Sequence, residues 1–160
     1  LARLSALPTG PSDEGLAHAD LHHGNFLLDA DGRVRPFDFD DCEVSPFVRE
    51  VAVPLYYAVA AVGKQAGDAE RRAFAGFFLR TFLAAFVRAQ PLSARALASL
   101  PDWLEMRSCI LFAALQETAA TGDLTAEARA AALRRIRDRL DQGPAWTGLD
   151  FGALAQELGT

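Results

Sequence analysis

Cysteine, methionine and lysine are scarce in this chain of 160 residues, and each scarcity excludes something. Two cysteines, Cys42 and Cys109, are too few for a disulfide framework, so we expect two free thiols in a reducing compartment, the cytoplasm. The single methionine is Met106 and the single lysine is Lys64. Because the chain starts at Leu1 rather than at a methionine, we expect it to be a piece of a longer protein.

Positive charge and long apolar runs are also in short supply. The chain has 16 Lys and Arg against 21 Asp and Glu, which gives a formal net charge of −5. Phosphate backbones require a cationic surface, so the acidic balance argues against a general binder of nucleic acid or of anionic membranes. No stretch is long and apolar enough to predict a membrane span, and the N-terminus lacks the basic-then-apolar order of a signal peptide.

The rest of the composition is typical of a folded domain. Apolar residues make up 51% of the chain and charged residues 23%, which argues against wholesale disorder. A chain of this length can bury one sizeable core, so we expect a single domain over residues 1–160. From about residue 45 onward, apolar residues recur at helical spacing, which predicts a mainly α domain.

Two long helices are expected first. One carries apolar residues from 48 to 62 and either kinks at Pro54 or begins close to it. The next, roughly 20 residues long, carries a phenylalanine stripe that we expect to pack in the core. The stripe consists of Phe74, Phe77, Phe78, Phe82 and Phe86.

Three more helices are expected after these. Ser99 is the expected N-cap of one that runs to about Thr121–Gly122. Thr125 is the expected N-cap of the next, which Gly143-Pro144 would end. A short last helix is expected over residues 151–158. None of these segments carries a recognisable motif, so the chemistry has to lie upstream.

The N-terminal part differs from the helical part. Residues 8–15 are rich in Pro, Gly, Ser and Asp and are expected to form a loop. Two short apolar segments, 25–28 and 33–39, flank an Asp-Gly turn, which predicts a β-hairpin. The expected fold class is therefore mainly α with a small β-hairpin.

Reactive side chains gather around this hairpin, between residues 18 and 43. Strong acids at the end of a short apolar strand are costly to bury without a counter-charge, and a divalent cation is the simplest one. The carboxylate of Asp38 and the amide oxygen of Asn25 would suit Mg²⁺, which keeps phosphate and water in its other positions. Asp40 is a further candidate metal ligand, although local hydrogen bonding or solvation is the simpler interpretation of both Asp40 and Asp41.

The spacing of these residues resembles that of the kinase-like phosphotransferases. His18, Asp20 and Asn25 follow the pattern H-x-D-x-x-x-x-N of a catalytic loop, and Asp38 follows thirteen residues after Asn25, across the hairpin. The order His-Ala-Asp-Leu-His-His-Gly-Asn, followed by Phe-Asp-Phe-Asp-Asp, looks closest to the aminoglycoside phosphotransferase family, which also includes choline-kinase-like enzymes. The resemblance covers about residues 15–52 and implies a protein-kinase-like C-terminal lobe.

The same resemblance implies roles for individual residues. Asp20 would accept or orient the proton of the attacking hydroxyl, and His18 would be a structural member of the loop that places Asp20. Asn25 and Asp38 would hold Mg²⁺ on the phosphates of ATP or GTP. The implied reaction is transfer of the γ-phosphoryl group to a hydroxyl of a small molecule. His22 is interpreted, like His23, as a loop residue.

The acceptor stays open at this point: an antibiotic, a homoserine-like metabolite, a choline-like amine, a sugar or a protein Ser/Thr. Four acids of the chain could recognise a cationic acceptor. The more ordinary interpretation of each is a surface or capping carboxylate. They are Glu43, Asp102, Glu105 and Glu117.

The sequence departs from the family pattern upstream of the motif. Family members have a mainly β N-terminal lobe, with a phosphate-covering loop and a Lys–Glu pair. Here 17 residues precede His18, none of them Lys, and Lys64 lies on the other side of the motif. We therefore expect a C-terminal lobe whose partner is the missing N-terminal lobe of the same protein. We also expect that this chain alone does not turn over ATP efficiently.

Two smaller departures lie near the catalytic loop. Where the family commonly has a Tyr-Asp-Leu-Ala type segment that opens the next helix, this chain has Arg49-Glu50-Val51-Ala52. We expect Glu50 to tie that helix to the loop with a longer arm. Ala19 stands where Gly is frequent, and is tolerated there unless the backbone needs a positive φ.

Two alternative functions, other than that of a kinase, stay open for this chain. In a metal-dependent hydrolase, His18, Asp20 and His22 would lie on one side of an extended segment and bind Zn²⁺ or a two-metal centre. Against this, the only other histidine is His23, and neither cysteine has metal-ligand spacing. The second alternative is a non-catalytic helical interaction module, which would leave the acidic cluster unexplained.

Overall fold

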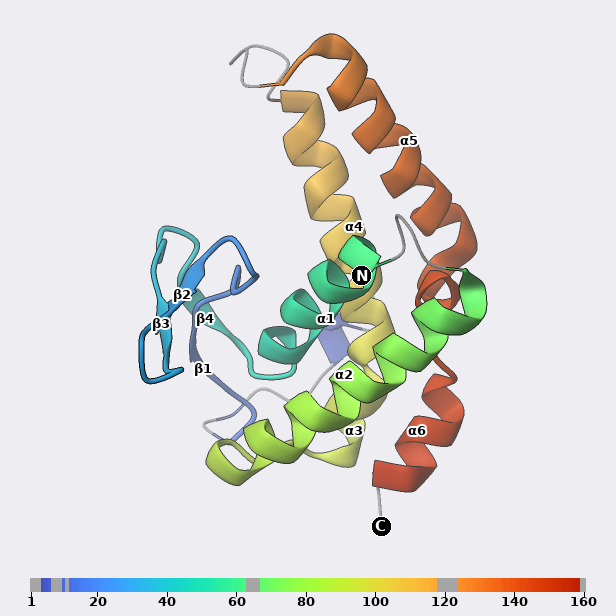
Figure 1. Cartoon of the computed structure of the whole chain (residues 1–160). Helices are drawn as coiled ribbons and strands as arrows, with labels where there is room; N and C mark the ends of the chain where they lie inside the picture. Colours follow the sequence, from blue (N-terminus) through green and yellow to red (C-terminus); the bar gives the residue numbers. More distant parts are fainter. Residues whose placement is uncertain (1–3, 7–9, 11, 63–66, 118–123, 159–160) are drawn as a thin grey trace.

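Helices and two small antiparallel sheets make up the computed structural model, which describes residues 4–6, 10, 12–62, 67–117 and 124–158 (Figure 1). The chain enters through a single 3₁₀ turn, η1 (Leu4–Ala6). The sheets lie together to one side of the helices (Figure 1). Most of the described residues are helical, so the expectation of a mainly α fold with a small hairpin is confirmed.

The predicted hairpin consists of β2 (Phe26–Leu28) and β3 (Val34–Pro36), which pair antiparallel. Gly32, in the turn between them, has a φ of 74°, a conformation that glycine adopts without steric cost. At the other end of the hairpin, the N–H of Phe37 donates to the carbonyl of Asn25 at 3.0 Å. The hairpin therefore brings the residues before β2 next to the residues after β3.

A second sheet was not predicted. It pairs β1 (Glu14–Ala17) antiparallel with β4 (Glu43–Pro46). The expected loop over residues 8–15 is therefore wrong at its C-terminal end, because Glu14 and Gly15 belong to β1. The paired strands close the base of the segment 18–42, which holds all the candidate catalytic and metal-binding residues.

Helix α1 (Arg49–Val62) lies in the middle of the helical part and contacts α2 (Asp68–Ala89) and, further along the chain, α4. Pro54 lies within α1, so the helix does not begin there. The buried side of α1 presents apolar side chains that are almost completely covered. They are Val51, Ala52, Val53, Leu55, Tyr56 and Val59.

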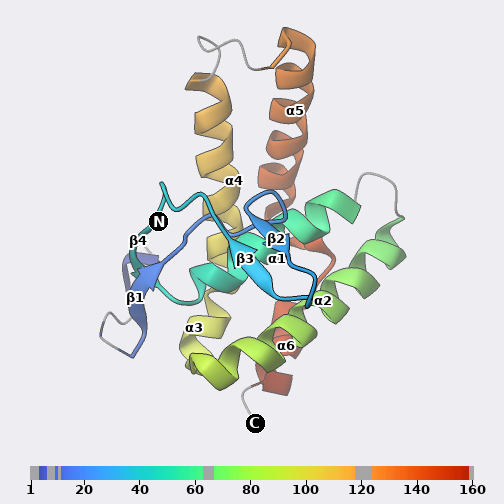
Figure 2. The same ribbon diagram turned by 60° about the vertical axis from the view of Figure 1, so that its left-hand side comes forward.

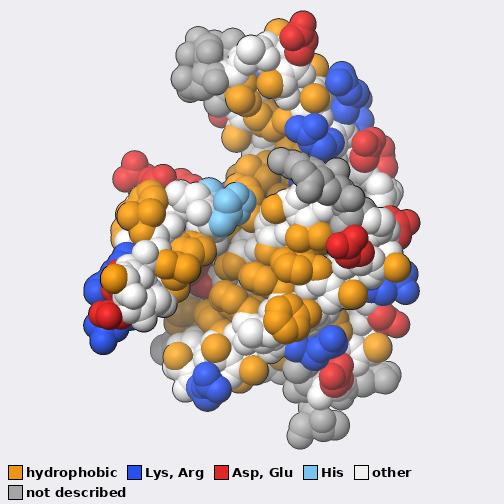
Figure 3. Space-filling view, in the orientation of Figure 1, with side chains coloured by type: hydrophobic (Ala, Val, Ile, Leu, Met, Phe, Trp, Pro, Cys, Tyr) orange, Lys and Arg blue, Asp and Glu red, His pale blue; other side chains and the backbone are white. Residues whose placement is uncertain are grey.

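The phenylalanine stripe of α2 lies only partly in the core. The rings of Phe78 and Phe82 stack at 5.8 Å and are partly buried, whereas Phe77 is 64% exposed. For Phe77 the expectation was wrong, because α2 packs along one face and Phe77 lies on another. Hydrophobic side chains gather on the face of the molecule that carries α2 (Figure 3).

Two helices follow, α3 (Ala94–Ala98) and α4 (Leu100–Glu117). Helix α4 begins directly after Ser99, as expected, and the Ser99 carbonyl accepts the N–H of Trp103 at 3.2 Å. The expected side-chain cap is wrong, because the Ser99 hydroxyl donates to a carbonyl of α3 at 2.6 Å. Ser93 caps α3 instead and accepts a backbone N–H at 3.1 Å. The expected end of this helical region, at 121–122, lies outside the described residues.

The C-terminal elements match the expectation closely. Thr125 caps α5 (Ala126–Gln142) and accepts an N–H of the first turn at 3.2 Å, and Gly143, with a φ of 57°, ends the helix. The 3₁₀ helix η3 (Gly143–Thr147) and α6 (Phe151–Leu158) complete the fold. Helices α4 and α5 run side by side and extend away from the sheets (Figures 1 and 2). Among the described residues, no helix combines the length and apolar character that crossing a bilayer requires.

Candidate active site

Asp20 is the centre of the site, and its carboxylate is surrounded by hydrogen-bond donors. Nη2 of Arg107, on α4, donates to Oδ1. Nδ2 of Asn25 donates to Oδ2 at 3.2 Å and to the backbone carbonyl of Asp20 at 3.0 Å. Nε2 of His22 lies 3.5 Å from Oδ2. The side chain is still 19% exposed, so the carboxylate is held in place by the protein and remains accessible from solvent.

Asn25 and Asp38 present oxygen atoms that fit a hard cation. The Asn25 amide directs its nitrogen to Asp20, and within the described residues its Oδ1 accepts no hydrogen bond. The Asp38 carboxylate is exposed and has no hydrogen-bond partner among those residues. Asp38 follows Phe37, whose N–H bonds Asn25, so the hairpin holds the two segments together. An amide oxygen and a carboxylate are the ligand types that Mg²⁺ takes from a protein that also binds phosphate.

His18 is a structural residue of this loop. It is buried, and its Nε2 lies 2.9 Å from the carbonyl of Phe37, to which it donates. Its ring packs against Phe39 with the centroids 4.7 Å apart. His18 therefore connects the Asp20 loop to the chain on both sides of Asp38.

The metal-hydrolase alternative finds no support in this geometry. Nε2 of His18 is engaged by a carbonyl, and Nδ1 of His22 accepts the N–H of Gly24 at 2.9 Å. Throughout the described part of the chain, no group of three or more His, Cys, Asp or Glu side chains could hold a metal ion. Among the described residues, His18, Asp20 and His22 therefore do not form such a group.

Glu50 fastens the loop to α1. Its Oε1 accepts the N–H of Ala19 at 2.8 Å, and its Oε2 accepts the N–H of His18 at 3.2 Å. The expectation that Glu50 ties the helix to the loop is confirmed. Ala19 has a φ of 63°, so the backbone does need a positive φ at this position. For alanine this conformation is strained and costs about 1 kcal/mol. The two hydrogen bonds that Glu50 accepts hold the backbone in that conformation.

Arg107 and Tyr57 belong to the site, and the sequence analysis missed both. The Arg107 guanidinium lies 5.1 Å from the centroid of the Tyr57 ring, and its Nη2 donates to the Tyr57 hydroxyl at 2.6 Å. Burial raises the pKa of Tyr57, so its hydroxyl stays protonated. One signal was available in the sequence: Arg107 is the only basic residue of α4.

The charge state of His22 is set by its surroundings. Burial lowers the pKa of His22 below its usual 6.5; Asp20 opposes this shift, while His23 and Arg107 add to it. Its ring lies 4.2 Å from that of Tyr57. Since Nδ1 accepts a hydrogen bond, the neutral ring carries its proton on Nε2, which faces Asp20.

This lowered pKa predicts a pH dependence of stability. His22 takes up a proton near pH 6.5 in the unfolded chain, but only at lower pH in the folded protein. Protonation therefore favours the unfolded chain, and the free energy of unfolding decreases as the pH falls below about 6.5. In urea unfolding at about pH 7.5 and 5.5, the wild type should lose more stability than His22→Gln. Equal losses in the two proteins would contradict the argument.

The remaining candidates lie away from these contacts. Asp40 and Asp41 are exposed in the turn that precedes β4. Glu43 forms an ion pair with Arg49, as an ordinary surface carboxylate does. Two cavities, of about 270 and 220 Å³, border the catalytic loop, and His23 lines both together with Tyr57. None of the four acids suggested for a cationic acceptor lines either cavity.

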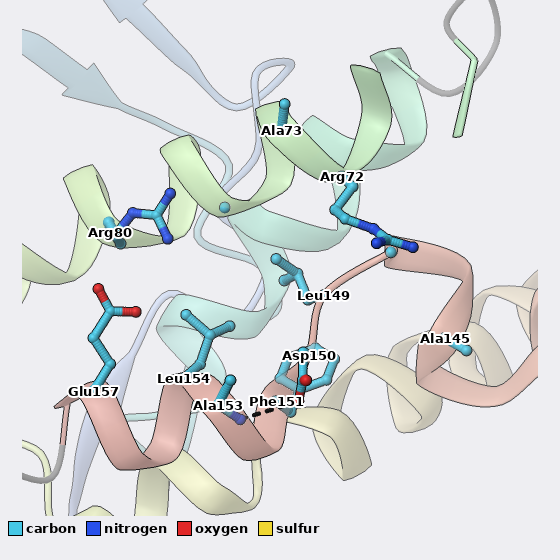
Figure 4. Close-up of a pocket in the computed structure, with 12 residues that line it drawn as sticks. Arg72, Ala73, Arg80, Ala145, Leu149, Asp150, Phe151, Ala153, Leu154 and Glu157 are labelled. Atoms are coloured by element: carbon cyan, nitrogen blue, oxygen red, sulfur yellow. Dashed lines mark hydrogen bonds between the residues drawn. The ribbon is translucent and has the colours of Figure 1, made fainter. Parts of the chain in front are cut away.

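A cavity of about 730 Å³ lies between α2 and the chain from η3 to α6 (Figure 4). Arg72 and Arg80 of α2 face Asp150 and Glu157 across it. No residue of the segment 18–42 lines this cavity, so it is not part of the candidate active site.

Comparison with known proteins agrees with this geometry. Residues 1–90 match the model of a phosphotransferase enzyme family. The chain belongs to that family. The predicted resemblance to aminoglycoside-phosphotransferase-like proteins is thereby confirmed.

Two relatives are informative. Amicoumacin kinase of Bacillus subtilis (strain 168) is 31% identical over 155 residues, which is 94% of this chain and 44% of that protein. The solved structure of amicoumacin kinase hAmiN in complex with AMP-PNP, Ca²⁺ and Ami has a TM-score of 0.79 and 31% identity, covering 96% of this chain and 45% of the other. The chain thus spans less than half the length of these relatives. Its fold is that of a kinase-like C-terminal lobe.

Proposed function

We propose that the protein transfers the γ-phosphoryl group of ATP to a hydroxyl group of a small molecule. The observation that carries this proposal is the Asp20–Asn25 contact, together with the hydrogen bond by which Phe37, the residue before Asp38, is joined to Asn25. Asp20 offers a carboxylate to a hydroxyl, while Asn25 and Asp38 offer free oxygens to a cation. A fixed base next to a cation site is the arrangement that phosphoryl transfer requires.

In the proposed reaction, the acceptor oxygen forms a bond to the γ-phosphorus and the bond from that phosphorus to the β–γ bridging oxygen breaks. The acceptor proton passes to the Asp20 carboxylate, and ADP leaves. Mg²⁺, held by Asn25 and Asp38, would neutralise charge on the phosphates. Little covalent chemistry is needed, so the contribution of the protein is to position and to neutralise. ATP is favoured because AMP-PNP, its analogue, is bound in the related structure; GTP is the alternative.

The acceptor to test first is amicoumacin, because both relatives are named for it. Among the described residues, no carboxylate lines the two cavities beside the catalytic loop. We propose further that an upstream N-terminal lobe completes the nucleotide site, which would leave this chain inactive alone. A cytoplasmic location stays a prediction from the free cysteines.

The test of the proposed function is a titration with Mn²⁺, a surrogate for Mg²⁺, with and without ADP. Binding should be weak, should tighten when ADP is present, and should be lost in Asp38→Asn. Asp31→Asn, in the exposed hairpin turn, is the matched control and should bind as the wild type does. Mn²⁺ binding that ignores ADP, or that survives in Asp38→Asn, would contradict the proposal.

A further inference from the structure

Arg107 contacts Asp20 with a positively charged side chain, although α4, on which it lies, is far from Asp20 in the chain. Arg107 is 6% exposed and lies 87 residues from Asp20 in the chain. One nitrogen, Nη2, donates both to Oδ1 of Asp20 and to the Tyr57 hydroxyl. The guanidinium lies over the Tyr57 ring, so both its position and its orientation are fixed.

Burying the charged side chain of Arg107 costs free energy, and stability alone does not explain why it is there. A buried position on the inner side of α4 would be filled at least as well by an apolar side chain, because a buried ion pair often contributes no net stability. Nε of Arg107 is moreover buried without a hydrogen-bond partner among the described residues. A buried donor without a partner costs free energy, and an isosteric apolar side chain would avoid that cost. The charge at this position therefore points to a role in the site.

The two oxygens of Asp20 consequently differ. Oδ1 is held by the buried guanidinium of Arg107. Oδ2 receives the Asn25 amide at 3.2 Å, and Nε2 of His22 lies 3.5 Å away. With Oδ1 clamped, the carboxylate cannot rotate, and Oδ2 remains the more weakly bonded oxygen.

We propose that Arg107 is a positioning residue for phosphoryl transfer, which fixes Oδ1 of Asp20 so that Oδ2 meets the acceptor hydroxyl. The inference rests on the proposed function and extends it to a helix outside the motif. Arg107 acts through Asp20 and does not itself touch the reacting atoms. The acceptor's proton then goes to Oδ2, while the charge of Arg107 stays on Oδ1.

The first measurement uses this chain and needs no activity. The side-chain amide signals of Asn25 in a ¹⁵N spectrum report on the Asp20 carboxylate, because the amide donates to Oδ2. We expect these signals to move in Arg107→Met, while the backbone signals of His18 and Ala19, held by Glu50, stay in place. Arg137→Met is the matched control, since that arginine is exposed on α5 and lies over Phe112.

The second measurement is kinetic, in the form of the protein that transfers phosphate: this chain, or this chain joined to its upstream lobe. Arg107→Met should lower kcat about 10²-fold while the KM for ATP changes less than about twofold, because a misplaced base slows transfer without weakening nucleotide binding. Arg107→Lys should recover part of the rate, since lysine keeps the charge without the planar fork. Arg137→Met should behave as the wild type.

Each outcome decides the proposal. Unmoved Asn25 signals, or an unchanged kcat, would overturn it. A general shift of the loop signals together with lost stability would reduce Arg107 to a structural residue. Should Arg107→Met not fold, Tyr57→Phe, which removes only the hydroxyl partner, must move the same Asn25 signals to a smaller extent. Failure of the Mn²⁺ test with moved Asn25 signals would reject the proposed function and leave the Arg107–Asp20 coupling standing.

Discussion

Replacing Glu50 with alanine should lower the free energy of unfolding by about 3 kcal/mol. The Glu50 carboxylate accepts two backbone N–H groups, from His18 and Ala19, which have no other acceptor in the part of the chain that the structure describes. His18 and Ala19 are both buried, so each donor would be left unpaired away from water. A loss of this size is a large fraction of the stability of a single domain, about 5–15 kcal/mol.

Chemical denaturation followed by circular dichroism measures this effect, and Glu43→Ala is the matched control. Glu43 is a half-exposed carboxylate whose ion pair with Arg49 lies at the surface, so its removal should cost less than about 1 kcal/mol. Glu50→Gln keeps one acceptor oxygen and should fall between the two. If Glu50→Ala were no more destabilising than Glu43→Ala, the loop would not depend on this attachment.

The parts of the fold that the sequence predicted are those that depend on neighbouring residues. The hairpin follows from a turn of four residues, and the start of α5 from one threonine cap. The spacing of Asp20, Asn25 and Asp38 is local in the same sense, since the hairpin joins the chain at Asn25 to the chain at Phe37, the residue before Asp38. Periodicity and turn chemistry act over a few residues, so one sequence is enough to detect them.

The parts that the sequence did not predict depend on residues far apart in the chain. β1 carries no period-two pattern, and only its partner β4, beyond the hairpin, makes it a strand. The Ser99 side chain does not cap α4, because a short helix, α3, precedes it and a carbonyl of that helix accepts the Ser99 hydroxyl. Phe77 repeats the apolar spacing of its neighbours, but the face of α2 on which it lies has no packing partner within the described residues.

In the candidate site too, the residues close together in the chain could be predicted, and those far apart could not. Asp20, its metal-binding candidates and the Glu50 attachment all lie within the motif, where resemblance is informative. Arg107 and Tyr57 come from α4 and α1, whose sequences carry no motif, and they meet Asp20 only in the folded chain. A single arginine among the apolar residues of a helix is a weak signal by itself. It becomes specific when its partner is a carboxylate that the motif had already singled out.

Asp20→Asn should separate nucleotide binding from chemistry. Asparagine keeps the size of the side chain but cannot take up the acceptor proton, so kcat for phosphoryl transfer should fall about 10³-fold. Asn25 and Asp38 are unaltered, and ADP should tighten Mn²⁺ binding as in the wild type. That binding also shows that the loop is still folded, which matters because the variant leaves the Arg107 guanidinium without its buried counter-charge.

The rate is measured as ADP release that depends on the acceptor, in the form of the protein that transfers phosphate. Asp41→Asn, an exposed acid that follows the same hairpin, is the control and should keep its rate. A variant Asp20→Asn that still transfers phosphate at a rate near that of the wild type would remove Asp20 as the base. A variant that loses Mn²⁺ binding together with the rate would instead show that Asp20 maintains the metal site. Only loss of transfer with binding retained fits a carboxylate whose more weakly bonded oxygen, Oδ2, meets the acceptor hydroxyl.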